Sequence, residues 1–263
     1  MNLIHKSLIK ELLKKYNAKP EKYLGQHFIL SKKALAKMIE AAEIKPSDLV
    51  IEIGPGLGTL TQELAKTGTK IVAIEKDSLM IRILKETLID YKNMDIIEAD
   101  ARYTHLYLPD VGHRVKRGKA VDKHNKYGEY KNGYKIVGNL PYNVATFLIR
   151  EWLELQNPPS MMVLMIQKEV AQRITAKPPR MNLLGVSIQY YASAEIIDYV
   201  PAEAFWPKPK VDAAIIKIVP TSKPPQKTRN AFFAVVKAGF AQPRKQLIGN
   251  LSKKLNIPKE KII

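Results

Sequence analysis

The chain of 263 residues contains no cysteine, which excludes disulfide frameworks, thiolate zinc sites, iron–sulfur clusters and cysteine nucleophiles. It has no apolar run near the ~20 residues that a membrane-spanning helix needs, and its first residues lack the apolar stretch of a signal peptide. We therefore expect a cytoplasmic protein without a membrane partner. Hydrophobic residues make up 46% of the chain, which is typical of globular proteins and excludes an intrinsically disordered one.

Acidic residues are scarce relative to basic ones. The chain has 25 Asp and Glu against 43 Lys and Arg, a net charge of +18. The excess is concentrated in residues 1–33, 111–135 and 207–263, with net charges of +6, +6 and +11. Lysines on solvated helix faces would explain part of this, but segregated basic segments favour a surface that follows phosphates. We expect nucleic acid as the partner and no membrane, although the charge alone would also suit an anionic membrane surface, which ranks second.

Short apolar strands alternate with helices in the middle of the chain. We expect strands at 49–53, 70–74, 95–98, 135–137 and 161–166, with further strands near 195–200 and 213–219. Strand, loop and helix in alternation predict an α/β fold with a parallel sheet covered on both faces. Helices are expected at 3–16, 32–42, 147–155, 168–174, 232–240 and 244–255, and around Leu60–Ala65 and Leu79–Leu84.

Three of the predicted strands end in residues suited to bind an adenosine. Gly54 and Gly56 follow the first strand and open a helix, which allows a ligand to approach the backbone closely. Glu75 ends the second strand, 21 residues after Gly54, where an acidic residue accepts hydrogen bonds from a ribose diol. Asp100 ends the third and can accept from an adenine amino group. A structural turn would explain the glycines alone, but together these residues predict an adenosine-containing cofactor.

The fourth predicted strand ends in Asn139-Leu140-Pro141-Tyr142. The Asn139 amide oxygen and the Leu140 carbonyl can both accept hydrogen bonds from an exocyclic amino group, which localises the nitrogen lone pair and improves the nucleophile. Tyr142 offers a face on which an unstacked base can lie. The structural alternative is an Asn-capped turn with proline in the first turn of the next helix. At the end of a sheet strand, the motif predicts a catalytic site that acts on an amine of a nucleobase.

The chain resembles the rRNA adenine N6-dimethyltransferase family between about residues 23 and 250. The matching motifs are Leu24-Gly25-Gln26-His27-Phe28, residues 51–58, residues 137–143, Gln167-Lys168-Glu169-Val170, residues 205–211, and Phe240 with Arg244-Lys245. The resemblance implies a class I, Rossmann-like methyltransferase fold that uses S-adenosylmethionine. It also implies N6-dimethylation of adjacent adenosines near the 3′ end of small-subunit (16S) rRNA, a step of ribosome biogenesis, with the immature 30S subunit as partner.

The same resemblance assigns the site. It implies that S-adenosylmethionine contacts His27, Ile29, Gly54, Gly56, Glu75, Asp100 and Asn139. It places Phe205 beside the target base, opposite Tyr142. His27 stands where the family often has asparagine. The histidines at 105, 113 and 124 lack partners at metal-binding spacings, so we expect no metal site.

Two alternative functions stay open at this stage. One is methylation of large-subunit rRNA, as in macrolide-resistance methyltransferases, which tend to have isoleucine where this chain has Leu140. The other is a non-enzymatic RNA-binding assembly factor, which the retained Glu75, Asp100 and Asn139 disfavour. The chain is expected to be a monomer with three parts: a basic N-terminal helix and cofactor-covering loop at 1–30, a catalytic domain at 31–220, and a small helical C-terminal domain at 221–263, expected to be truncated. A basic insert is expected at 111–134.

Overall fold

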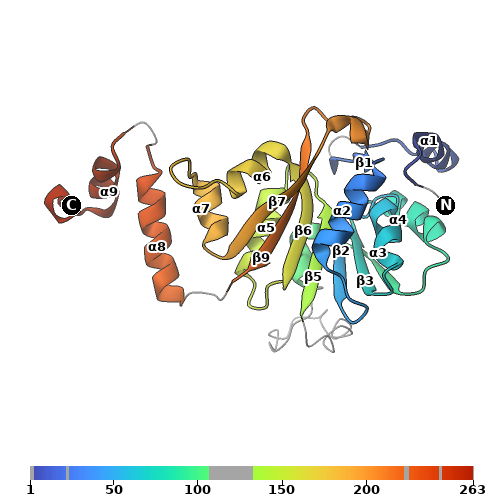
Figure 1. Cartoon of the computed structure of the whole chain (residues 1–263), viewed down its shortest axis with the longest axis horizontal. Coiled ribbons are helices and arrows are strands. Elements are labelled where there is room, and N and C mark those ends of the chain that lie inside the picture. The colour runs from blue at the N-terminus through green and yellow to red at the C-terminus, as the bar shows by residue number, and fades with distance from the viewer. Residues whose placement is uncertain (1–2, 22–23, 107–132, 222–224, 243–244, 263) are drawn as a thin grey trace.

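A seven-stranded sheet forms the centre of the protein in the computed structural model, which describes residues 3–21, 24–106, 133–221, 225–242 and 245–262 (Figure 1). The strands are β2 (Leu49–Ile53), β3 (Lys70–Glu75), β4 (Met94–Glu98), β5 (Tyr134–Asn139), β6 (Met161–Gln167), β7 (Ala192–Val200) and β9 (Ala213–Pro220). Their order is β4-β3-β2-β5-β6-β9-β7. The predicted Rossmann-like α/β sheet is therefore confirmed.

Strand β9 alone runs against the direction of the other six strands of this sheet. Strands β2 to β6 pair in parallel, as their alternation with helices predicts. Strand β9 pairs antiparallel with both β6 and β7. The connection from β7 to β9 contains only a short 3₁₀-helix and the two-residue β8, so the chain turns back instead of crossing over.

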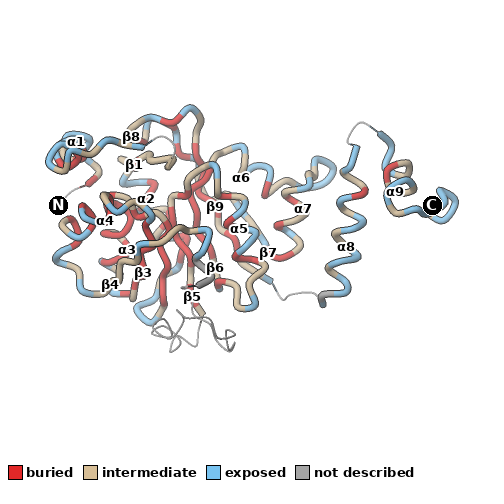
Figure 2. Tube along the Cα trace, turned by 180° about the vertical axis from the view of Figure 1, so that it is seen from behind, coloured by how far each residue is buried: buried red, intermediate tan, exposed pale blue. Residues whose placement is uncertain are grey.

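Helices cover both faces of the sheet, as expected. On one face α2 (Lys32–Ala42) and α3 (Thr59–Ala65) pack on Val50 and Val137. On the other, α5 (Ala145–Glu154), α6 (Lys168–Ile174) and α7 (Leu183–Gln189) enclose a core that includes Ile51 and Ile136. Alternate residues of one strand thus enter different cores. All five residues of β2 are buried, and the buried trace runs through the middle of the sheet (Figure 2).

The helix predictions are largely confirmed, with two omissions. Helix α2 has the predicted bounds, and Ser31 caps it by accepting from the Ala34 N–H. Helix α7 was not predicted, nor was the pairing of β1 (Phe28–Ile29) with β8 (Phe205–Trp206). Two-residue strands carry no periodic pattern, so that ladder could not be predicted from the sequence.

The N-terminal helix packs beside the predicted cofactor loop. Helix α1 (Lys6–Lys15) buries Ile9 and Leu13 in a small core with Phe28 and Leu57. The same core includes residues of α4 (Ser78–Thr87). Helix α1 therefore holds the segment that leads into β1 against the glycine turn.

The C-terminal helices α8 (Gln226–Gly239) and α9 (Leu247–Leu255) lie away from the centre of the sheet, with α8 beside α7 and α9 on the far side of α8 (Figure 1). Phe232 stacks on Tyr190 with ring centroids 4.1 Å apart. Buried Asn250 links the two helices by donating to the carbonyls of Gly239 and Gln242, each at 3.0 Å. Helix α8 begins earlier than predicted, because its first turn is polar and lacks apolar periodicity.

Most of the expected basic insert at 111–134 lies outside the described residues; Tyr134 begins β5. None of the helices in the described ranges is long and apolar enough to cross a membrane.

Candidate active site

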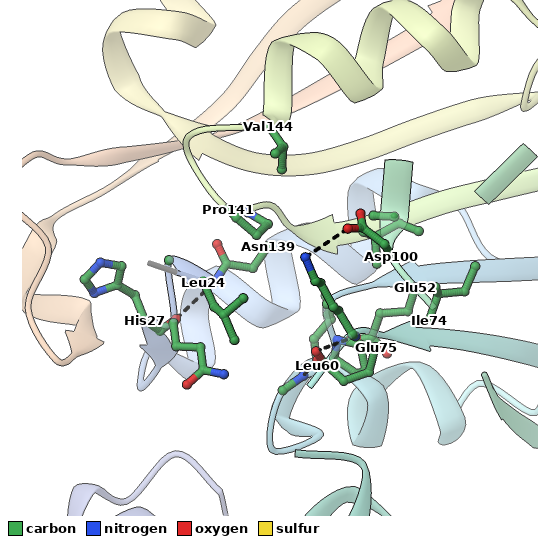
Figure 3. A pocket seen from close by; sticks show the side chains of 18 of the residues that line it. Leu24, His27, Glu52, Leu60, Ile74, Glu75, Asp100, Asn139, Pro141 and Val144 are labelled. Carbon is green, nitrogen blue, oxygen red and sulfur yellow. Dashed lines mark hydrogen bonds and ion pairs between the residues drawn. The ribbon is translucent and has the colours of Figure 1, made fainter. Parts of the chain in front are cut away.

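A cavity of about 280 Å³ opens where β2, β3 and β5 end. The carboxyl ends of parallel strands meet at one edge of a sheet, which is where open α/β sheets bind ligands. The cavity wall includes eight of the residues predicted for the site: His27, Ile29, Gly54, Gly56, Glu75, Asp100, Asn139 and Pro141. In Figure 3, Glu75, Asp100 and Asn139 come from the ends of separate strands, and His27 comes from the N-terminal loop.

The turn after β2 contains Gly54 and Gly56, and its backbone conformation would be strained with any other residue at these positions. Gly54 and Gly56 have φ angles of +66° and +56°, in the left-handed region that favours glycine. The Gly56 N–H donates to Glu75 Oε2 at 3.0 Å (Figure 3). The turn is therefore fixed by the residue that ends the neighbouring strand.

Glu75 is almost completely buried and accepts several backbone hydrogen bonds. Besides the Gly56 bond, its Oε1 accepts from the N–H groups of Lys76 and Asp77 at 2.8 and 2.9 Å. Burial raises the pKa of this carboxyl, and the three backbone donors offset part of that effect. Each carboxylate oxygen can accept more than one hydrogen bond, so Glu75 can hold the turn and still accept from a ribose hydroxyl.

Asp100 follows β4, lines the same cavity and is held ionised by two cations. Arg102 donates to it through Nη2 at 2.7 Å, and Lys76 Nζ lies 3.0 Å from Oδ2. The hydrogen bond from Arg102 is the main reason that the pKa of Asp100 lies well below its usual range. An adenine amino group would have to share this carboxylate with Arg102 and Lys76, neither of which was predicted as a site residue.

Asn139 ends β5 with its amide orientation fixed. Its Nδ2 donates to the His27 carbonyl at 3.1 Å (Figure 3). A carbonyl oxygen only accepts, so the amide oxygen Oδ1 is the acceptor that remains for a ligand. The Leu140 N–H donates to the Met165 carbonyl at 3.0 Å and anchors the turn to β6.

The remaining predicted residues lie around this turn. The Leu140 side chain is buried in the core, Pro141 lines the cavity, and Tyr142 is half-buried. Phe205 is only 3% exposed, lies opposite Ile29 in the β1–β8 pair, and is not in the cavity wall. Tyr142 follows Pro141 but, like Phe205, is not in the cavity wall. The base-contacting roles of Tyr142 and Phe205 and the acceptor role of the Leu140 carbonyl therefore stay predictions.

Glu52 is a site residue that the sequence reasoning missed. It lines the cavity from β2 and is 1% exposed, and its Oε2 has no hydrogen-bond partner. Burial, with a smaller contribution from the nearby Glu75, raises its pKa to about 8. The sequence does contain an indication of this role, because Glu52 is the one charged residue in the apolar strand Leu49–Ile53. A buried carboxyl is costly, so it points to a functional constraint.

We expect the free energy of unfolding to depend on pH because of the Glu52 carboxyl. An unfolded chain loses the Glu52 proton near pH 4.5, but the folded chain retains it until about pH 8. Between these values the folded state binds the extra proton, so the free energy of unfolding falls as pH rises, by up to about 1.4 kcal/mol per pH unit. Glu52→Gln should remove this contribution. Denaturant unfolding at pH 5, 6, 7 and 8 measures it, with exposed Glu40→Gln as control; equal slopes in all three proteins would contradict the prediction.

The described residues contain no group of three or more His, Asp or Glu side chains that could hold a metal ion. The site therefore offers hydrogen-bond acceptors, carboxylates and glycine backbone. These groups suit an organic ligand with amino and hydroxyl groups.

Comparisons with known proteins show the family of the chain. The family model described as "Ribosomal RNA adenine dimethylase" matches residues 17–261. A protein of Dehalococcoides mccartyi named "Ribosomal RNA small subunit methyltransferase A" is 39% identical over 97% of this chain and 82% of its own length. A protein of the same name from Geobacillus kaustophilus is 39% identical over 95% of this chain and 82% of its own.

Solved structures show the same fold. A dimethyladenosine transferase from Plasmodium falciparum has a TM-score of 0.65 at 26% identity, over 88% of this chain and 77% of that one. The 23S rRNA methyltransferase ErmE has a TM-score of 0.68 at 23% identity, over 89% of this chain and 86% of that one. The family match over nearly the whole chain and the identity to full-length relatives establish that this chain belongs to the ribosomal RNA adenine dimethylase family.

Proposed function

We propose that this protein transfers methyl groups from S-adenosylmethionine to the N6 amino group of adjacent adenosines near the 3′ end of small-subunit rRNA. The observation that carries this function is the Asn139 amide, whose nitrogen is committed to the His27 carbonyl and whose oxygen is left as an acceptor. An acceptor beside a nucleoside-binding cavity suits a substrate with an exocyclic amine.

The cavity residues fit S-adenosylmethionine. Glu75 is placed to accept from ribose hydroxyls, and Asp100 from the adenine amino group. The unpartnered oxygen of Glu52 suits a cationic part of the ligand, because an opposite charge favours the ionised form of a buried carboxyl that otherwise retains its proton. When bound, this cofactor supplies a methyl group already activated by a sulfonium, so the protein contributes positioning and electrostatics.

The N6 amine is oriented by hydrogen bonds to this chain. Asn139 Oδ1 accepts from one N–H, and the Leu140 carbonyl is the proposed acceptor for the other. Two such bonds concentrate the lone pair on nitrogen and direct it at the methyl donor. We assign no general base, because the proton can leave to water after the transfer.

Small-subunit rRNA is favoured over the two alternatives. The full-length relatives at 39% identity carry a small-subunit name, whereas ErmE, at 23% identity, supports the fold alone. A non-enzymatic role is disfavoured because Glu52, Glu75, Asp100 and Asn139 all meet in one cavity.

Tritiated methyl transfer to immature 30S subunits tests the proposal, with nucleoside mass spectrometry to identify the product. N6,N6-dimethyladenosine in the small-subunit rRNA is the expected result. Large-subunit rRNA is the matched substrate control, and exclusive labelling of it would replace the proposed substrate. No labelling of either RNA by folded, cofactor-binding protein would contradict an enzymatic function.

The segment 111–134 is expected to contribute to RNA affinity. Changing Arg114, Lys116, Arg117 and Lys119 to Glu should weaken binding to a small-subunit rRNA fragment, because phosphate contacts are lost. Each lost contact should reduce the slope of the logarithm of the binding constant against the logarithm of the salt concentration by about 0.7–0.9. Binding titrations between low and moderate salt measure this. Unchanged affinity and slope would show that the segment is a solvated insertion, and lower affinity with an unchanged slope would point to a folding defect.

A further inference from the structure

The imidazole of His27 faces the ring of Tyr142. The two ring centroids are 6.0 Å apart and the planes are inclined by only 24°. Both residues are half-buried, so neither ring is sealed in the core. The pair consists of one ring from the N-terminal loop and one from the turn after β5.

The orientation of the His27 imidazole is fixed by Pro207, which lies 180 positions away in the chain. Its Nδ1 lies 2.6 Å from the Pro207 carbonyl, which follows β8. Because a carbonyl oxygen only accepts, Nδ1 is the protonated nitrogen. In Figure 3 the imidazole points away from Glu75 and Asp100, while the backbone carbonyl of His27 points toward Asn139. The side chain is thus directed away from the proposed cofactor contacts.

The loop that carries His27 lies directly on the turn that carries Tyr142. A Cβ on Gly25 would lie 3.2 Å from Pro141 Cβ, and Asn139 holds the His27 carbonyl at 3.1 Å. The segments that carry the two rings are therefore joined beside the amide that receives the amine in the proposed function. Phe205, by contrast, is buried in the β1–β8 pair.

We propose that His27 is a positioning residue for the target adenine, which stacks on Tyr142 with the His27 imidazole completing the aromatic wall. Aromatic faces hold bases that have left a helical stack. Tyr142 follows Asn139 by three residues in the same turn, so the proposal directs the N6 edge of the stacked base to Asn139 Oδ1. This inference rests on the proposed function and reassigns the His27 side chain from cofactor to RNA.

The test uses the full chain and a small-subunit rRNA fragment in which 2-aminopurine replaces a target adenosine. Base stacking is read from fluorescence, S-adenosylmethionine affinity from calorimetry, and KM from methylation of the unmodified fragment. His27→Ala should reduce the fluorescence change on binding and raise KM for RNA by about five-fold or more, the effect of losing one base–ring stack. Affinity for S-adenosylmethionine should stay unchanged, because the His27 carbonyl remains.

Three further variants separate stacking from structure. His27→Phe, which keeps a ring, should retain most of the fluorescence change, whereas His27→Asn should behave as the alanine variant. Exposed His5→Ala is the matched control. Weaker cofactor binding by His27→Ala with normal fluorescence would overturn the inference, as would normal fluorescence and KM in both ring-less variants. If the wild-type protein methylates no RNA, the proposed function fails; if it does and His27→Ala matches it, only this inference fails.

Discussion

Replacing Asn139 with alanine is expected to abolish methyl transfer and to leave RNA affinity near that of the wild-type protein. The variant loses the acceptor that orients the N6 amine, and misplacing a reacting group by about 1 Å costs on the order of 10²-fold in rate. RNA affinity comes mainly from phosphate contacts by basic residues, to which a neutral amide at the end of β5 does not contribute. Single-turnover methylation and equilibrium RNA binding measure the two effects.

The same substitution also removes the bond from Asn139 Nδ2 to the His27 carbonyl. Calorimetry with S-adenosylmethionine and a thermal melt show whether the N-terminal loop remains in place. Asn143→Ala is the matched control, because Asn143 lines the same cavity but is exposed; it should retain most activity. Methylation by Asn139→Ala at the wild-type rate would remove the proposed mechanism.

Glu75→Ala is expected to weaken S-adenosylmethionine binding by about 1.5–3 kcal/mol, the usual contribution of a hydrogen bond to a charged group. The reason is the place of Glu75 at the end of β3, where it faces the cavity beside the glycine turn. Calorimetric titration gives the change directly. Unchanged affinity in a folded variant would contradict the assignment.

The structure adds a consequence for stability. From the sequence alone, Glu75→Ala should leave the fold intact, but the buried carboxylate accepts from three backbone N–H groups. Losing it leaves those donors unpaired, so we also expect a lower melting temperature. Glu75→Gln keeps one acceptor oxygen and should recover part of that loss while binding the cofactor more weakly. Glu63→Ala, on the surface of α3, controls for removing an acidic residue.

The sequence by itself determined the main elements and most of the cavity. Apolar runs predicted β2, β3, β5 and β6, because a strand buried on both faces has a mostly apolar sequence. Strand β4 lies at the sheet edge and is only half-buried, but its short apolar segment was still recognised. The Ser31 cap fixed the start of α2. Gly54, Glu75, Asp100 and Asn139 could be brought together from sequence because each follows a parallel strand, and such ends meet at one edge of the sheet.

Only the tertiary structure decided which residues meet across long stretches of chain. The antiparallel β9, the β1–β8 pair and the contact of His27 with Pro207 join segments whose separation leaves no local pattern. The burial of Phe205 and of Glu52 likewise depends on packing from several elements. Periodicity and turn residues report the local backbone, whereas long-range partners, burial and the resulting pKa values are set when distant segments pack together.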